Sequence, residues 1–253
     1  MEKGRLMDKL NKTYQDFWLW IVNLTDRKAV NLSKGDLKVE DASKSNDKIV
    51  LRVRSTRPFL INGLTGRRRD STRTDYDVAI EFVQYVYFDE QQGCFKAIKS
   101  TVRLLYMENY KIVKIHQERF GKPGKIYSGI HFDLVSQDSN NTDGYDHPIF
   151  HASFDLTCID PQRAGRGNYE KPSLGRFDFP RIPTAPMDLG AVIFSILRDH
   201  LPEKVIRGWP QKMSDVIAEL PRYPRGTLDM CLKEDIDLSN RDWYKLDGQR
   251  NST

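Results

Sequence analysis

Residues 76–107, YDVAIEFVQYVYFDEQQGCFKAIKSTVRLLYM, form the stretch of sequence that decides the fold. Apolar side chains recur at every second position in both halves of this stretch, which is the period of a β-strand with one buried face. The turn residues 90–93, EQQG, separate the two halves, and a connection this short joins antiparallel neighbours. The sequence therefore predicts a long antiparallel hairpin with strands at 76–88 and 95–107.

The same period of two continues on both sides of the hairpin. It predicts further strands at residues 49–54, 110–120, 126–135 and 149–157, with short turns at 108–109 and 121–124. Residues 34–48, which are rich in Ser, Asp and Lys, read as a polar connector. We therefore expect a long antiparallel β-meander of five to six strands.

Helical periodicity marks both ends of the chain. Near the N-terminus the apolar residues recur every three or four positions, as Leu6, Leu10, Tyr14, Phe17, Ile21 and Leu24. After the sheet, Thr184 caps a second helix whose predicted buried stripe is Met187, Ala191, Phe194 and Leu197. A third helix is expected at 211–220, between two prolines.

These elements predict one α+β domain over residues 1–253, in which the helices cover one face of the sheet. Its expected parts are an N-terminal helix at 1–26, the sheet at 49–157, a loop at 158–183, a helical segment at 184–222 and a tail at 223–253. The other face of the sheet is then open to water, a partner or a functional site.

Composition and missing motifs narrow the classes of function. The chain has 39% hydrophobic and 30% charged residues, three widely spaced cysteines, and neither a signal-peptide pattern nor an apolar run that would span a membrane. We therefore expect a cytoplasmic protein with no membrane partner. The motifs GxxxxGK[ST], GxGxxG, GxSxG, HExxH and CxxC are all missing, which argues against P-loop, dinucleotide, elbow-hydrolase and zinc-ribbon proteins.

Polar residues alternate with apolar ones in two of the predicted strands. His131 and Asp133 share one side of the strand at 126–135, and His151, Ser153 and Asp155 share one side of the strand at 149–157. If these strands form a hairpin, parity places Asp133 opposite His151 and His131 opposite Ser153.

The turns predicted at 108–109 and 121–124 extend this polar face. They would place Lys114 opposite both His131 and Arg103, with His116 and Glu118 on the same side. The face would then gather Arg103, Lys114, His116, Glu118, His131, Asp133, His151 and Asp155.

Three interpretations of this face stay open. It can be a solvated surface. It can be a centre for Zn²⁺ or Mn²⁺ with His116, His131, His151 and Asp155 as ligands, Asp133 orienting water, and Lys114 or Arg103 stabilising an anion. It can also be a site without metal, in which Asp133 orients a histidine as general base.

A basic stretch is the second candidate region. Residues 52–73 hold seven arginines and one acid, and the net charge of the chain is +5. The glycines at 63 and 66 suggest an exposed loop, in which Arg67, Arg68, Arg69 and Arg73 would fork onto phosphates of nucleic acid or dock on an acidic protein.

Three segments, IHFD at 130–133, HPIFH at 147–151 and RIPTAPMD at 181–188, carry a resemblance. Their pattern, HxD, HPxxH and RxPTxxMD, resembles one in a family of uncharacterised bacterial proteins. That family has no assigned activity, so the resemblance implies a bacterial, cytoplasmic protein and no particular chemistry.

Two functions follow from the residues. The first is a metal-dependent hydrolase that acts on a phosphate-bearing substrate, including nucleic acid. The alternative is a non-catalytic interaction module, a companion subunit that binds a protein or nucleic-acid partner through its arginine-rich loop.

Overall fold

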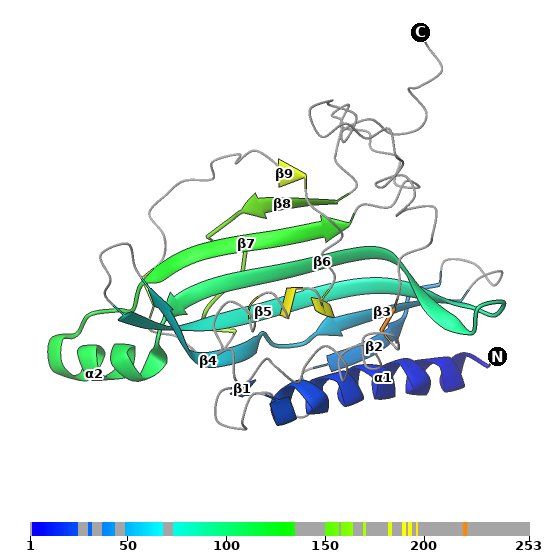
Figure 1. The fold of residues 1–253 in the computed structure, drawn as a ribbon, viewed down its shortest axis with the longest axis horizontal. Coiled ribbons are helices and arrows are strands. Elements are labelled where there is room, and N and C mark those ends of the chain that lie inside the picture. The colour runs from blue at the N-terminus through cyan, green and yellow to red at the C-terminus, as the bar shows by residue number, and fades with distance from the viewer. Residues whose placement is uncertain are drawn as a thin grey trace, which may run out of the picture.

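An antiparallel sheet dominates the computed structural model of the chain (Figure 1). The structure describes residues 2–24, 30–31, 37–43, 49–67, 73–134, 150–156, 158–163, 169–170, 182–183, 189–190, 192–193, 196 and 220–221. Within them lie the helices α1 (Lys3–Leu24) and α2 (Tyr110–Phe120). The strands are β1 (Val30–Asn31), β2 (Leu37–Asp41), β3 (Val50–Ser55), β4 (Phe59–Arg67), β5 (Arg73–Asp89), β6 (Cys94–Glu108), β7 (Ile126–Leu134), β8 (Phe150–Phe154) and β9 (Ile182–Pro183).

The strands follow one another as a meander, as the sequence predicts. β4, β5, β6, β7, β8 and β9 are successive antiparallel neighbours. The predicted hairpin is the 17-residue β5 and the 15-residue β6. Asp89 closes its turn by accepting hydrogen bonds from the backbone N–H groups of Gln91 and Gln92, and Gly93 supplies the positive φ of 65°.

Two shorter strands share the outer edge of β5. β3 pairs with residues 83–87 of β5, and β4 pairs with residues 73–80. On this side neither β3 nor β4 pairs with Phe82, and the Ser55 hydroxyl accepts from Phe82 N at 3.0 Å and donates to Phe82 O at 3.3 Å instead. The edge of β5 is therefore built from two strands with a seam between them.

Helix α1 covers one face of the sheet (Figure 1). The side chains of Leu6, Leu10, Tyr14, Phe17 and Trp18 are buried, which confirms the predicted apolar stripe for the residues whose side chains are described. Tyr14 stacks on Phe82 and Trp18 on Phe59, with ring centroids 5.5 and 4.2 Å apart. Burying such a side chain contributes roughly 1.5–3 kcal/mol, so this principal cluster supplies much of the stability of the sheet.

The opposite face of the sheet carries a second, smaller apolar cluster at one end. It consists of Leu60, Ala79, Leu105, Met107, Val113, Ile159 and Tyr169. Because side chains alternate along a strand, residues 81 and 103, two positions from Ala79 and Leu105, continue this face. Both are charged, so the face changes from apolar to polar along β5 and β6.

The prediction of a strand at 110–120 is wrong, because these residues form helix α2. Asn109 caps the helix by accepting from Lys111 N, and Gly121 ends it with a φ of 64°. Buried Asp77 accepts from Asn109 Nδ2 and Tyr110 N, which fixes the entry of the chain. The β-branched residues in the segment suggested a strand, whereas the Asn and Gly that flank it were the informative signals.

Two further predictions need correction. The polar connector predicted at 34–48 contains β2, whose charged Lys38 and Glu40 alternate with Leu37 and Val39. Part of the basic loop is also strand, because β4 runs to Arg67 with an irregular register at Gly63, whose N–H donates to Asp77. Glycine and charge indicated loops in both places, although each segment pairs with a neighbouring strand.

Most of the C-terminal region lies outside the described residues. The described positions 189, 190, 192, 193 and 196 are helical, and Leu189, Val192, Ile193 and Ile196 are buried in the principal cluster. The predicted stripe at Met187, Ala191, Phe194 and Leu197, the helix at 211–220 and the tail fall outside them, so the C-terminal helices stay a prediction. Within the described part of the chain, no helix has the length and apolar character that crossing a membrane requires.

Candidate functional site

Strand register aligns two rows of residues across the polar part of the second face. One row is Glu81, Arg103, His131 and Ser153, and the next is Val83, Thr101, Asp133 and His151. Cross-strand neighbours in such a row have Cβ atoms about 5 Å apart. The predicted pairing of Asp133 with His151 and of His131 with Ser153 is confirmed, and Arg103 lies opposite His131 directly.

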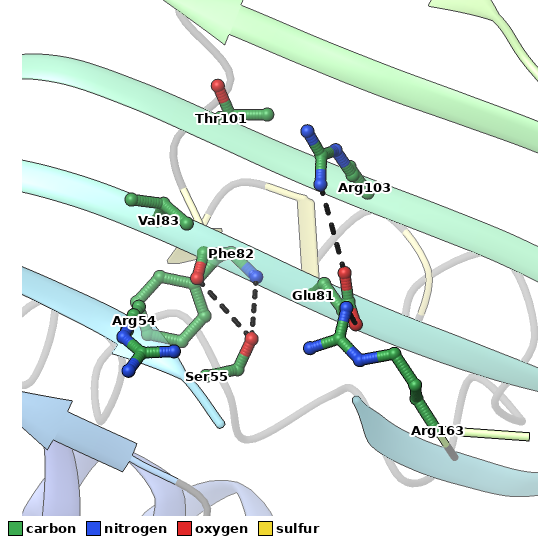
Figure 2. A pocket seen from close by; sticks show the side chains of 8 residues that line it. All are labelled: Arg54, Ser55, Glu81, Phe82, Val83, Thr101, Arg103 and Arg163. Carbon is green, nitrogen blue, oxygen red and sulfur yellow. Dashed lines mark hydrogen bonds and ion pairs between the residues drawn. The ribbon is translucent and has the colours of Figure 1, made fainter. Parts of the chain in front are cut away.

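A pocket of about 110 Å³ opens beside the first row. Its lining includes Arg54, Ser55, Glu81, Thr101, Arg103 and Arg163. The three arginines come from β3, from β6 and from the turn after β8, and Figure 2 shows the Glu81 carboxylate between the guanidinium groups of Arg103 and Arg163. Three cations and one carboxylate from distant parts of the chain therefore meet at one hollow.

Glu81 is the most unusual group in this pocket. Its side chain is 9% exposed, its Oε1 lies 2.9 Å from Nη1 of Arg163, and its Oε2 lies 3.9 Å from Nη1 of Arg103. Oε1 receives no hydrogen bond, so its contact with Arg163 is an ion pair only. Burial raises the pKa of Glu81 above its ordinary value, because the loss of water outweighs the attraction of Arg163 and Arg103, and nearby Asp160 adds to the rise.

The contacts of residues 158–162 position Arg163 next to the sheet. Ile159 is 2% exposed within the second cluster, and the Cys158 thiol donates to Leu104 O at 3.2 Å. Asp160 then closes a turn, because its backbone O accepts from Arg163 N and its side chain accepts from Gln162 N. Burial also raises the pKa of Cys158, to about 12, so this thiol stays protonated and serves as an anchor.

A carboxylate–imidazole pair lies next to Arg103. Asp133 Oδ2 is 3.3 Å from His131 Nε2, and Asp133 Oδ1 accepts a hydrogen bond of 2.6 Å from the Thr101 hydroxyl. Both side chains are about a quarter exposed, so water reaches them. A carboxylate fixed in this way orients the imidazole, which is the arrangement of a general base.

Lys114 and His116 do not join this group, whereas Asp155 and His151 are placed here through their backbone contacts. Lys114 and His116 lie on exposed positions of α2, where Lys114 is 4.0 Å from Glu118, because the segment is a helix and not a strand of the sheet. Asp155 follows β8, and its N–H donates to Gly129 O. The backbone of His151 lies opposite Asp133, but its side chain is outside the description.

His116 drops out of the predicted metal centre, because it lies on helix α2 and not on a strand of the sheet. Among the residues described, no group of three or more His, Cys, Asp or Glu side chains is placed to hold a metal ion. A centre that includes His131 and His151 stays a prediction, since the His151 side chain is not described. In the basic stretch, the backbone of Arg67 on β4 lies opposite that of Arg73 on β5. Arg68 and Arg69 lie outside the described residues.

Sequence reasoning missed the three pocket residues Glu81, Arg54 and Arg163. A signal for Glu81 was present, because it is the one acid within the apolar run 78–83, with Ala79 and Val83 on its side. No local pattern marks Arg163, which reaches the pocket only through the path of residues 158–163.

The site must therefore be interpreted from its own chemistry. Guanidinium groups at the mouth of a pocket bind anions, and a buried carboxylate between them restricts which anions fit. No family model, curated protein or solved structure matches the chain.

Proposed function

We propose that the chain binds a phosphate-bearing ligand in the pocket around Glu81. The observation that carries this proposal is the convergence of Arg54, Arg103 and Arg163 on one hollow of about 110 Å³. A cavity of ~150 Å³ holds a molecule of benzene, so this hollow has room for a phosphoryl group of five heavy atoms. Arg103 and Arg163 are about half exposed, which leaves their guanidinium groups accessible from solvent.

The neighbouring pair gives the proposal an enzymatic form, hydrolysis of a phosphate ester. His131, oriented by Asp133, takes a proton from water while the water oxygen attacks phosphorus. The P–O bond to the ester oxygen breaks, the departing oxygen takes up a proton, and phosphate and an alcohol are released. Arg103 lies opposite His131 in register, and in this mechanism it stabilises the charge of the phosphoryl oxygens.

Calorimetric titration with phenyl phosphate tests the binding proposal. We expect Arg163→Gln and Arg103→Gln each to weaken binding about tenfold or more, because a hydrogen bond to a charged group contributes about 1.5–3 kcal/mol. Arg119→Gln, which removes an exposed cation from α2, is the matched control and should bind as the wild type does. The proposal fails if the wild type shows no binding at millimolar concentration, or if the control weakens binding as much as the pocket variants.

Release of p-nitrophenol from p-nitrophenyl phosphate tests the enzymatic form separately. His131→Ala should lower the rate at least 100-fold, the lower end of the effect of a general base, while phenyl phosphate still binds. A wild type that binds the ester and never hydrolyses it would leave a binding protein without this reaction.

The interaction module is a second candidate, favoured by the register of the β4–β5 hairpin. Arg67 and Arg73 are paired across the last rung of this ladder, and Arg68 and Arg69 lie in the connection between them. Such a cluster suits the phosphates of nucleic acid. If this candidate is correct, Arg67→Gln/Arg68→Gln/Arg69→Gln loses retention on duplex DNA in low salt and keeps its affinity for phenyl phosphate.

A further inference from the structure

We infer that Glu81 makes the pocket selective for oxyanions that carry a proton, so that it prefers a phosphate monoester to the corresponding sulfate ester. This inference rests on the proposed function, and it names the chemical class that the pocket selects. It depends on the contacts of the Glu81 carboxylate, on the charges around it and on the protons of the two ligands.

The contacts leave the Glu81 carboxylate short of hydrogen-bond donors. Oε1 is buried and accepts no hydrogen bond, and the 3.9 Å between Oε2 and Arg103 exceeds hydrogen-bond distance. A buried carboxylate is stabilised by donors, so a ligand that brings an O–H group into the pocket gains a short, charge-assisted bond. A ligand with acceptor oxygens alone brings like charge against Glu81.

The charges around Glu81 favour a singly charged ligand. The groups that face it are Arg103 from β6, Arg163 and Asp160 from the segment after β8, and Arg54 across the pocket. Arg54 shares Glu40 with Lys38 and Arg52, so this one carboxylate does not neutralise all three cations. Arg54, Arg103 and Arg163 against Glu81 and Asp160 leave one positive charge, which one monoanion neutralises.

The protons of the two ligands then decide between them. A phosphate monoester loses its second proton with a pKa near 6, so at pH 6.5 about a quarter of it is a monoanion with one P–OH group. A sulfate monoester has the same charge and nearly the same shape but no proton. The raised pKa of Glu81 is consistent with a proton shared between its carboxylate and the bound oxygen. A site built for a hydrogen-bond donor rejects an analogue without it strongly.

Competition between phenyl phosphate and phenyl sulfate at pH 6.5 tests the inference. We expect the wild-type protein to bind phenyl phosphate at least tenfold more tightly than phenyl sulfate. In Glu81→Gln the ratio should fall to within threefold, because the amide of glutamine donates a hydrogen bond to either anion. Both absolute affinities should rise in this variant, since a negative charge is removed, and the ratio is therefore the diagnostic quantity.

Arg163→Gln serves as the matched control, because it should weaken both ligands and keep their ratio. The ratio in the wild type tests the inference even if Glu81→Gln does not fold. Equal binding of the two esters by the wild type, or an unchanged ratio in Glu81→Gln, overturns the inference and leaves the phosphate proposal intact. Failure of the wild type to bind either ester overturns the proposed function itself.

Discussion

Single residues set the spacing of the strands beneath the polar face, and Gly129 on β7 is the tightest of them. A Cβ atom added at Gly129 would lie 2.0 Å from the backbone O of Asp155 and 2.7 Å from its carbonyl C. Both are backbone atoms held by the hydrogen bond from Asp155 N to Gly129 O, so no side-chain rotation relieves the clash. The position therefore requires glycine for close approach of the two chain segments.

Gly129→Ala should destabilise the protein by about 3 kcal/mol, at the upper end of the usual cost of overpacking. Urea denaturation measures the change. Gly4→Ala is the control, since nothing lies within 4 Å of a Cβ at that position of α1, and alanine suits a helix at least as well as glycine. Equal stability of the two variants would show that β7 and the residues after β8 are not in close contact.

For single residues, the alternation of side chains along a strand was the most reliable predictor of which residues lie opposite one another. Alternation on two strands placed His131 opposite Ser153 and Asp133 opposite His151 without knowledge of the sheet. Attention to histidines, however, led away from Glu81, whose environment depends on burial by groups distant in sequence. The contact of Arg163 with Glu81 joins residues 82 positions apart through a segment with no regular structure, and no local pattern encodes it.

At the scale of elements, β2 and β3 are held together by charge. Glu40 on β2 forms ion pairs with Lys38 on its own strand and with Arg52 and Arg54 on β3. Hydrogen bonds from Arg54, then from Lys38 and Arg52, lower the pKa of Glu40 from 4.5 to about 2. Arg52 and Arg54, two of the seven arginines counted in the basic stretch, thus pair with Glu40 on a neighbouring strand, so the charge of the stretch overstated the case for binding.

The sign of this shift predicts a pH dependence. Because the pKa of Glu40 is lower in the folded state, its contribution to stability is complete above about pH 4.5 and is lost as the pH falls through about 2. Wild type should therefore exceed Glu40→Gln in stability at pH 6, and the difference should vanish near pH 2. Urea denaturation from pH 2 to 6 measures it, with Glu170→Gln, an exposed carboxylate elsewhere, as control. A pH-independent difference would contradict the assignment.

Helix α2 shows where sequence reasoning about elements fails. Its residues alternate well enough to imitate a strand, and the error moved Lys114 and His116 onto the sheet face. The deciding interactions are partly nonlocal, because Asp77, 33 positions before Tyr110, accepts hydrogen bonds at the start of the helix. The capping residues Asn109 and Gly121 are recognisable from the local sequence, so the sequence held enough information to predict this helix.

At the scale of the whole molecule, the sheet separates the principal apolar cluster from the smaller cluster that lies beside the pocket. The principal cluster under α1 and the smaller cluster of the second face lie on opposite sides of the same strands. The first includes α1, whereas the second includes Ile159 and so anchors the segment that carries Arg163. Truncation of a side chain in the principal cluster should therefore lower stability alone, whereas truncation in the second cluster should also weaken the binding of phenyl phosphate.

Ile159→Ala and Leu10→Ala test this separation. Both residues are almost fully buried, and each truncation should cost about 2–5 kcal/mol of stability. Measured where both variants are folded, the affinity for phenyl phosphate should fall several-fold in Ile159→Ala, because Arg163 loses its anchored turn, and stay unchanged in Leu10→Ala. Equal affinities would show that the second cluster does not position Arg163.

The class of fold was accessible from sequence, because long period-two segments with short turns admit few arrangements other than an antiparallel meander. The strands β2 and β4 were not accessible, because they carry the charges and glycines that also mark loops. Each is defined by its pairing, β2 with β3 and β4 with β1 and β5, and local composition cannot reveal such pairing.

The seam between β3 and β4 has one more consequence. Ser55 and Phe82, which meet at this seam, also line the pocket, so the hollow lies where a continuous edge strand would otherwise run. β5 and β6 supply five residues of this lining, whereas Ser55 is the last residue of β3 and directly precedes the short connection at residues 56–58. Insertions or exchanges in that connection would change the pocket beside Ser55 while the paired strands keep their register. The size of the pocket can thus change without substitutions in the apolar core.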